Sequence, residues 1–330
     1  SQERRNRMIN WGILGAGNIA HRFLQGLSYS EEGQLYAVAS HSQEKRDEFK
    51  RLCPQIITYD NYDDILNDKN IDAVYLAMWH KDHYQWAKQA LLKHKAVLCE
   101  KPAVLSTEEM KELAKIAKEN QVFFMEAMKT RFIPMVLELK KILDEGTIGK
   151  IQRVENRFCY DISQAQNTRY LFEKDQGGIL NDVGSYNIAS LLDYINENIV
   201  KVENDVTIDR DVDVHDRVTV TFEHGQIGFM EMAMDENKAP LMTIYGTKGK
   251  IECIPFYRPE KATVFLNDGE SYEVEKGYTH DDFYTQIAEV HQCLKNNQIE
   301  SKRMSLEDSI KVQELTEQIR EKVKEKKNEI

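Results

Sequence analysis

The sequence predicts an α/β protein whose N-terminal part forms a doubly wound parallel sheet and whose C-terminal part is built on longer strands. Three observations predict this. Short apolar runs alternate with helical patterns from Ile9 to about Met125, a glycine turn follows the first run, and the rhythm changes after residues 146–149. Alternation of buried strands and amphipathic helices is typical of βαβ units. We therefore expect two domains, residues 1–126 and residues 127–330.

Five short apolar runs in the N-terminal part have the length and composition of buried strands. They are Ile9–Leu14, Leu35–Ala39, Ala73–Ala77, Ala96–Cys99 and Val122–Met125. Helices are expected between them, because apolar residues share one face over residues 19–27 and again over residues 86–91. Ser106 followed by Glu109 forms a capping box that opens a third helix.

After residue 149 the strands are longer and are joined by turns. They are expected at Ile151–Asp161, Asp216–Phe222, Gln226–Asp235, Leu241–Tyr245 and Lys250–Cys253. One helix, roughly Gly184–Tyr194, interrupts them early. A charged amphipathic helix from about Leu306 to Lys327 closes the chain and is expected to pack back onto the fold.

The composition argues against several classes of function. The 330 residues are 41% hydrophobic, enough for a large core, and the formal charge of −11 is spread out rather than forming the basic stripe of a nucleic-acid-binding protein. No apolar run approaches the roughly 20 residues of a membrane helix, and residues 1–7 lack the apolar core of a signal peptide. The five cysteines are odd in number and form no C-x-x-C pair, which favours reduced thiols and a cytoplasmic location.

The first predicted strand runs directly into Gly15-x-Gly17-x-x-Ala20, a glycine turn that opens a helix. In this setting glycines let the backbone approach a pyrophosphate. The helix N-terminus, which begins with Asn18 and Ile19, supplies amides and a positive dipole. The alternative is an ordinary tight turn between a strand and a helix. We interpret the motif as a dinucleotide-binding turn.

The end of the second predicted strand bears on the choice between NAD and NADP. NAD-specific proteins usually place Asp or Glu here to bind the ribose hydroxyls, but this chain has Ser40, His41 and Ser42. These residues and the nearby Lys45 and Arg46 suit a 2′-phosphate better, although the two cations could equally form the exposed face of a helix. The sequence therefore favours NADP and leaves NAD open.

A lysine stands at the carboxyl end of the fourth predicted strand, in the segment Glu100-Lys101-Pro102. Ligands of open α/β sheets bind at this edge, and Pro102 restricts the preceding residue to extended backbone, which gives the Lys101 side chain a fixed direction. An ammonium there can donate hydrogen bonds to a substrate hydroxyl. The alternative is a surface lysine whose stem covers apolar neighbours.

Asp182 and Tyr186 stand four residues apart, so on a helix they share one face. A tyrosine that is oriented by a carboxylate and lies near a lysine can donate or accept a proton. The alternative is that Asp182 caps the helix and Tyr186 packs in the core.

His80 and His83 have a spacing seen in metal ligands. No third and fourth ligand is evident, however, and Asp82 stands where a helix would be capped, so no metal is expected.

Together these residues resemble the Gfo/Idh/MocA oxidoreductase family, and most of all its branch of dimeric dihydrodiol dehydrogenase and NADP-dependent D-xylose dehydrogenase. Glu100-Lys101-Pro102 is similar to the family's signature. Asp182 and Tyr186 resemble its D-x-G-x-Y motif, and His80 and His83 resemble the branch's H-P-x-H segment. The resemblance covers nearly the whole chain. Further similar segments are Glu126–Pro134, Arg169 before the double glycine, Gly246–Gly249, Pro255–Tyr257 and Gly277–Ser301.

The resemblance implies a Rossmann domain, an α/β domain with a large open and mostly antiparallel sheet, and a homodimer or homotetramer. The implied reaction passes a hydride between NADP or NAD and a secondary alcohol or ketone of a sugar, polyol or trans-dihydrodiol. Tyr186 would take or give the hydroxyl proton, Lys101 would assist that transfer, and Asp182 would orient the substrate or the tyrosine. The implied substrate contacts are Lys101, Arg131, Arg169, Asp182 and Tyr186. The implied cofactor contacts are Gly15, Gly17, Asn18, Ile19, Ser40, His41, Lys45, Ala77, Trp79, His80, His83, Glu100 and Lys101.

Four positions depart from the family pattern. Trp79 replaces a smaller residue, Lys81 replaces a proline and Lys129 replaces a tryptophan, so a pocket lined by them would differ in shape and charge. His41 stands where many NADP-using relatives have arginine. Two alternatives to a dehydrogenase stay open: a redox glycosidase of the same fold that retains NAD, and a non-catalytic dinucleotide-binding regulator.

Overall fold

The computed structural model describes residues 6–330, which form two compact units. The first comprises the described chain up to Phe132 together with Thr279–Gln313, and the second comprises Ile133–Tyr278 together with Glu314–Ile330. The chain therefore returns to the first unit at Thr279. The sequence prediction divides the chain once, between residues 126 and 127, and does not contain this return. That division into domains stays a prediction.

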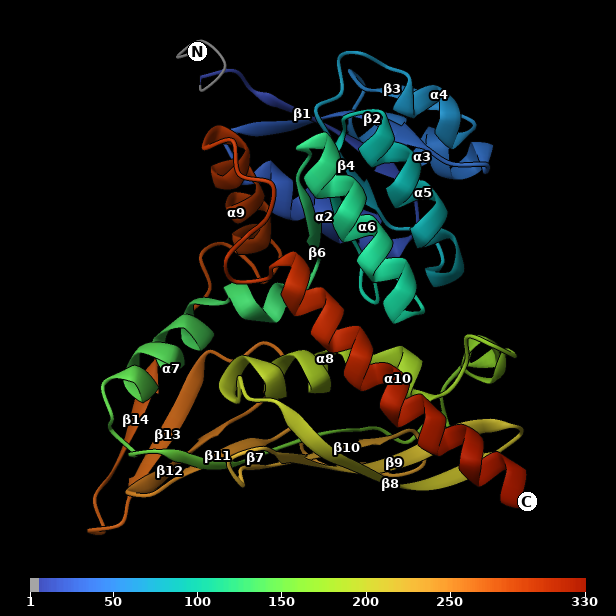
Figure 1. Ribbon diagram of the computed structural model, residues 1–330. Coiled ribbons are helices and arrows are strands. Elements are labelled where there is room, and N and C mark those ends of the chain that lie inside the picture. The colour runs from blue at the N-terminus through green and yellow to red at the C-terminus, as the bar shows by residue number, and fades with distance from the viewer. Residues whose placement is uncertain (1–5) are drawn as a thin grey trace. The chain divides into compact units, whose positions relative to one another are not determined.

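The first unit contains a six-stranded sheet with helices around it (Figure 1). Its strands are β1 (Ile9–Leu14), β2 (Gly33–Ala39), β3 (Ile57–Tyr59), β4 (Ala73–Leu76), β5 (Ala96–Cys99) and β6 (Phe124–Glu126). They follow the order β3-β2-β1-β4-β5-β6, and every neighbouring pair is parallel. The predicted doubly wound parallel sheet is confirmed, with its ligand-binding edge at the carboxyl ends of these strands.

The helices of the first unit alternate with its strands up to residue 132, and one more, α9, comes after the strands of the second unit. They are α2 (Asn18–Ser28), α3 (Gln43–Leu52), α4 (Tyr62–Leu66), α5 (His80–Leu92), α6 (Thr107–Asn120), the 3-10 helix η1 (Lys129–Phe132) and α9 (Tyr284–Lys295). Helix α10 (Leu306–Glu329) begins in the first unit and ends in the second.

Local sequence explains where α6 begins. Ser106 is its N-cap as predicted, and the Ser106 Oγ accepts a hydrogen bond from the Glu109 N–H at 3.1 Å. The start of α5 differs from expectation. Trp79 occupies its N-cap, so Asp82 lies inside the first turn rather than at the cap where the sequence placed it. A carboxylate in that turn still favours the helix through its dipole.

The second unit is built on an eight-stranded sheet. Its strands are β7 (Ile151–Cys159), β8 (Ile199–Asp209), β9 (Val212–Phe222), β10 (Ile227–Ala233), β11 (Met242–Gly246), β12 (Gly249–Cys253), β13 (Lys261–Leu266) and β14 (Ser271–Glu275). They follow the order β14-β13-β12-β11-β7-β10-β9-β8, and all neighbours are antiparallel except β7 and β10. The predicted second, mostly antiparallel sheet is confirmed.

Besides the end of α10, the second unit contains two further helices and a 3-10 helix. They are α7 (Pro134–Asp144), η2 (Arg169–Phe172) and α8 (Ile179–Tyr194). Helix α8 packs on β7, β9 and β10, and α7 packs against β13 (Figure 1). Gly228 on β10 allows this packing, because a Cβ there would lie 2.6 Å from the Leu191 side chain of α8. The predicted helix at Gly184–Tyr194 forms but begins at Ile179.

Within residues 6–330 no helix has the length and apolar character needed to cross a membrane. All five cysteines are free thiols, and all except Cys53 are buried. The cytoplasmic location expected from the cysteine pattern stays a prediction.

Candidate active site

The glycine turn joins β1 to α2 at the carboxyl edge of the parallel sheet. Gly15 has a φ of +96°, and a Cβ there would lie 2.9 Å from the Met78 backbone nitrogen, so both conformation and packing require glycine. Gly17 is the N-cap of α2 with a φ of −84°, and a Cβ there would meet no protein atom within 4 Å. The fold therefore needs a glycine at position 15 but not at position 17, and the space beside Gly17 is open.

The N-terminus of α2 fits an anionic ligand. Gly17 supplies no side-chain cap, and the first turn, which begins with Asn18 and Ile19, carries no acidic residue. The N–H groups at a helix start and the helix dipole both favour a negative group. The open space beside Gly17 lets such a group approach the backbone, so the pyrophosphate of a dinucleotide fits this turn.

The end of β2 leads through three polar residues into α3. Ser42 caps α3, since its Oγ accepts a hydrogen bond from the Lys45 N–H at 3.3 Å. The Arg46 Nη1 donates to the Ser40 carbonyl oxygen at 2.7 Å, which holds the guanidinium at the strand end. His41 is exposed, with its Nδ1 3.1 Å from the Asp60 carbonyl oxygen. A histidine and an arginine thus lie where a ribose-binding carboxylate is usual in NAD-specific proteins.

Lys101 lies in the loop that follows β5, and its peptide bond to Pro102 is cis. The preceding Glu100 accepts a hydrogen bond from the Tyr75 hydroxyl on β4. The pKa of His80, the first residue of α5, is lowered to about 4, mainly by burial and also by the nearby His83 ring and Lys101 ammonium. The His80 ring is therefore neutral at physiological pH.

The structure therefore brings three predicted segments to one edge of one sheet. The glycine turn follows β1, Ala77 to His80 follow β4, and Glu100 with Lys101 follow β5, and these strands are neighbours in the order β1-β4-β5. Trp79 is 64% exposed there, with the Lys81 Nζ 5.9 Å from its ring centroid. These residues can hold a nicotinamide dinucleotide.

The His83 ring is placed differently from the other predicted cofactor contacts. It is fully buried, and both ring nitrogens face backbone carbonyl oxygens: Nδ1 lies 2.8 Å from Pro102 and Nε2 lies 2.9 Å from Met78. Both nitrogens are therefore engaged by the protein, which argues against the metal-ligand alternative for this residue. Direct contact of His83 with the cofactor stays a prediction.

Asp182 and Tyr186 lie on α8 in the second unit, one helical turn apart. The N-cap of α8 is Gly178, so the alternative in which Asp182 caps the helix is wrong. The Tyr160 hydroxyl, just after β7, donates a hydrogen bond to the Asp182 carboxylate. Burial first, and then the Asp182 charge, raise the pKa of Tyr160 above its usual value, which keeps this hydroxyl a donor.

Aromatic rings surround Tyr186 within the second unit. Its ring centroid lies 6.0 Å from that of Phe158 on β7 and 5.7 Å from that of Tyr257. Sequence reasoning did not single out Tyr160 or Phe158. The available signal was their spacing of two residues at the end of the predicted strand 151–161, which places both on the sheet face that α8 covers.

Arg131 and Arg169, two of the predicted substrate contacts, differ in how far they are exposed to solvent. Arg131 is only 4% exposed, and its Nη1 lies 3.3 Å from the Asp308 carboxylate in the first unit. The Arg169 side chain is 95% exposed in the second unit. Contact of either arginine with a substrate stays a prediction.

Lys129, one of the departures from the family pattern, is buried with its Nζ 2.7 Å from the Asp282 carboxylate, so its charge is compensated within the first unit.

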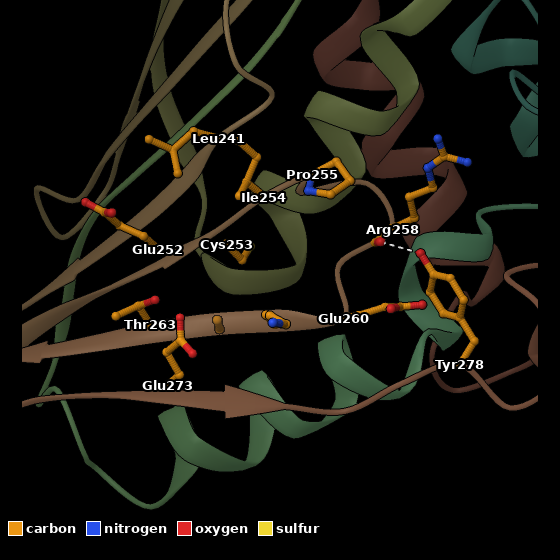
Figure 2. A pocket seen from close by; sticks show the side chains of 12 residues that line it. Leu241, Glu252, Cys253, Ile254, Pro255, Arg258, Glu260, Thr263, Glu273 and Tyr278 are labelled. Carbon is orange, nitrogen blue, oxygen red and sulfur yellow. Dashed lines mark hydrogen bonds between the residues drawn. The ribbon is translucent and has the colours of Figure 1, made fainter.

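A pocket of about 530 Å³ lies at β12, β13 and β14 in the second unit (Figure 2). Glu252, Thr263 and Glu273, which are paired across these strands, contribute to its wall. The Tyr278 hydroxyl donates to the Arg258 carbonyl oxygen at 2.6 Å beside it. None of the predicted site residues lines this pocket.

Two groups of side chains in the second unit have the composition of metal sites. They are Glu197 with Glu223 and His224, and His215 with Glu231 and Glu236. In the second group the Glu231 carboxylate already lies 2.7 Å from the His215 Nε2 and 2.9 Å from the Lys238 Nζ. The Lys238 ammonium thus lies where a metal would bind Glu231, and the group is part of a network of polar contacts within the protein.

Comparison with known proteins places these features in a family. Residues 9–128 match the sequence profile of an oxidoreductase family with an NAD-binding Rossmann fold, GFO_IDH_MocA, and residues 136–252 match that family's C-terminal domain. The D-xylose 1-dehydrogenase (NADP(+)) of Hypocrea jecorina is 27% identical, with 94% of this chain and 90% of that protein covered. The trans-1,2-dihydrobenzene-1,2-diol dehydrogenase of Mus musculus is 28% identical, with 96% and 97% covered.

A solved structure shows the same fold. The 3-ketoreductase of Actinomadura kijaniata in complex with NADP and TDP-benzene matches with a TM-score of 0.84 and 22% identity, and the match covers 95% of this chain and 97% of that one. At this identity the likeness concerns the fold alone.

Proposed function

The chain belongs to the Gfo/Idh/MocA oxidoreductase family, and on this premise we propose that it is an NADP-dependent dehydrogenase acting on a secondary alcohol of a sugar, polyol or trans-dihydrodiol. The observation that carries the proposal is the convergence of the glycine turn, the residues after β4 and Lys101 at one edge of the parallel sheet. The relatives named for D-xylose and for a dihydrodiol support the substrate class.

The proposed reaction assigns one task to each side chain. When bound, the nicotinamide supplies the hydride acceptor for oxidation or the donor for reduction. Lys101 donates a hydrogen bond to the substrate hydroxyl and stabilises the negative charge that develops as the proton leaves. Tyr186 takes that proton, and Asp182, held by Tyr160, orients the substrate or the tyrosine. Oxidation is expected to be favoured as pH rises, because it releases one proton for each hydride transferred.

A spectrophotometric screen tests the proposal. Reduced nicotinamide is followed by its absorbance, with NAD and with NADP, against aldoses, polyols, inositols and trans-dihydrodiols. A substrate-dependent signal establishes a dehydrogenase and its substrate class. Cofactor that copurifies, without net turnover of free dinucleotide, would support a redox glycosidase instead. Cofactor binding with no chemistry on any of these compounds would support a regulator.

We also propose that His41, Lys45 and Arg46 bind the 2′-phosphate of NADP. Replacing His41 by aspartate should shift the ratio of the NAD and NADP dissociation constants toward NAD by about tenfold or more, roughly 1.4 kcal/mol. The new carboxylate repels the 2′-phosphate and can bind ribose hydroxyls. Fluorescence titration with both cofactors measures the ratio.

The neutral variant His41→Asn separates charge from the loss of the histidine ring. It should weaken NADP binding without improving NAD binding, because it brings no carboxylate. If neither variant changes the ratio of affinities, another segment reads the ribose.

We further propose that the protein forms a homodimer or homotetramer through the face of the eight-stranded sheet that α8 does not cover. Phe229, half-buried on β10, points to that face, because it alternates with the fully buried Met230. Light scattering coupled to size-exclusion chromatography measures the oligomeric state, and a monomer at working concentration would overturn this part of the proposal.

A further inference from the structure

The buried His83 connects two loops at the carboxyl edge of the parallel sheet. It lies on α5, and its ring reaches the Pro102 carbonyl oxygen after β5 at 2.8 Å and the Met78 carbonyl oxygen after β4 at 2.9 Å. Both distances are short enough for a hydrogen bond, but a neutral imidazole has one N–H and can donate to only one of the two oxygens. One side chain therefore spans the loop that carries Lys101 and the loop beside it.

The loop after β4 is in turn packed against the glycine turn. A Cβ at Gly15 would lie 2.9 Å from the Met78 nitrogen and 3.1 Å from the Ala77 carbonyl carbon, so the two backbones already approach as closely as a glycine permits. Contact therefore continues from Gly15 through Met78 and His83 to Pro102. Lys101 precedes that proline.

Other side chains anchor the Lys101 loop farther along. The Glu126 Oε2 accepts a hydrogen bond from the Ala103 N–H at 2.8 Å, and the Gln313 Nε2 donates to the Val104 carbonyl oxygen at 2.9 Å. These contacts tie the loop to β6 and α10. The contact of His83 differs from these two, because it joins the Lys101 loop to the segment after β4, and that segment touches the glycine turn.

We propose that His83 is a positioning residue, which sets the Lys101 loop relative to the dinucleotide turn by donating a hydrogen bond from Nδ1 to the Pro102 carbonyl oxygen. The inference rests on the proposed function, which gives Lys101 and the glycine turn their roles. Burial lowers the pKa of His83, so the ring is neutral and has one N–H to donate. On this proposal that hydrogen goes to the Pro102 carbonyl oxygen, and the Met78 carbonyl oxygen is a packing neighbour of the ring rather than a hydrogen-bond acceptor.

Two substitutions at this position separate the hydrogen bond from the volume of the ring. Leucine fills the site without a donor, whereas the amide nitrogen of asparagine lies near the place of Nδ1 and can still donate to Pro102. His83→Leu should lower kcat by about tenfold, less than the roughly 10²-fold that a displacement of 1 Å can cost, with little change in the NADP dissociation constant. His83→Asn should recover most of the lost kcat.

His291 offers a matched control in the same unit. It is also a fully buried histidine, and its Nε2 accepts from the Trp11 Nε1 at 2.9 Å. His291→Leu should lower the melting temperature, as any lost buried hydrogen bond would, and leave kcat unchanged. The proposal is overturned if His83→Leu keeps the wild-type kcat, if His83→Asn is no better than His83→Leu, or if His291→Leu lowers kcat as much.

A second readout does not require turnover. Reductive methylation with ¹³C-formaldehyde labels lysines, and the Lys101 signal is assigned by its loss in Lys101→Arg. That signal should move in His83→Leu, return in His83→Asn and stay in place in His291→Leu. If the wild-type protein turns over no substrate of the screen, the proposed function fails, but this measurement still tests the role of His83. A Lys101 signal that does not move in His83→Leu would overturn that role.

Discussion

Lys101→Ala is expected to lower kcat by about 10²-fold or more and to leave the NADP dissociation constant nearly unchanged. The ammonium stabilises charge that develops on the substrate oxygen during the reaction, so its loss affects the transition state more than the bound cofactor. Steady-state kinetics with the substrate found by the screen gives kcat, and fluorescence titration gives the cofactor affinity.

Two further variants make this result specific. Lys101→Arg keeps the positive charge but replaces a compact ammonium by a planar guanidinium, so it should recover only part of the activity. Lys111→Ala removes an exposed lysine from α6 and should change nothing. Wild-type turnover in Lys101→Ala would remove the lysine from the mechanism. A parallel loss of NADP affinity would make Lys101 a cofactor contact instead.

The central strands of the parallel sheet could be predicted from sequence because they are buried on both faces. β1 and β5 begin and end at the predicted residues, since a strand with two buried faces appears as a nearly continuous apolar run, interrupted in β1 by Asn10. β3 is too short to show any pattern, and β14 is exposed and rich in acid, so neither has the signal on which the prediction relies. Edge strands of this kind are recognised only by their pairing.

The return of the chain to the first unit could not be read from local patterns. Helix α9 belongs to that unit partly because Trp11 and His291, far apart in sequence, form a buried hydrogen bond. Gly33 makes room for the same imidazole, since a Cβ there would lie 2.5 Å from its Nε2. Such pairs carry no periodicity and depend on the finished fold.

The candidate site shows the same limit. The glycine turn and Lys101 were predictable, because both stand at strand ends and their chemistry is local. The contact of His83 with Pro102 and that of Tyr160 with Asp182 join side chains to partners 19 and 22 residues away. The sequence marks the residue types at these positions but not their partners, so the positioning role of His83 emerges only from the structure.

The two glycines of the turn allow the dinucleotide interpretation to be tested apart from the fold. Gly17→Ser should weaken NADP binding by roughly 10²-fold, about 2.7 kcal/mol, because its side chain enters the open space through which the pyrophosphate approaches. The same change should not destabilise the protein without cofactor: the backbone at this position is extended, the space is empty of protein atoms, and serine is a good N-cap. Titration calorimetry with NADP gives the affinity.

Gly15→Ala provides the opposite pattern. A positive φ and a Cβ 2.9 Å from the Met78 backbone should lower the free energy of unfolding by about 2–4 kcal/mol even in the absence of cofactor. Denaturant unfolding of both cofactor-free variants separates the two cases. Wild-type NADP affinity in Gly17→Ser would make the motif an ordinary tight turn. Equal destabilisation of both variants would mean that Gly17 also serves the fold, so a loss of binding there could no longer be assigned to the pyrophosphate.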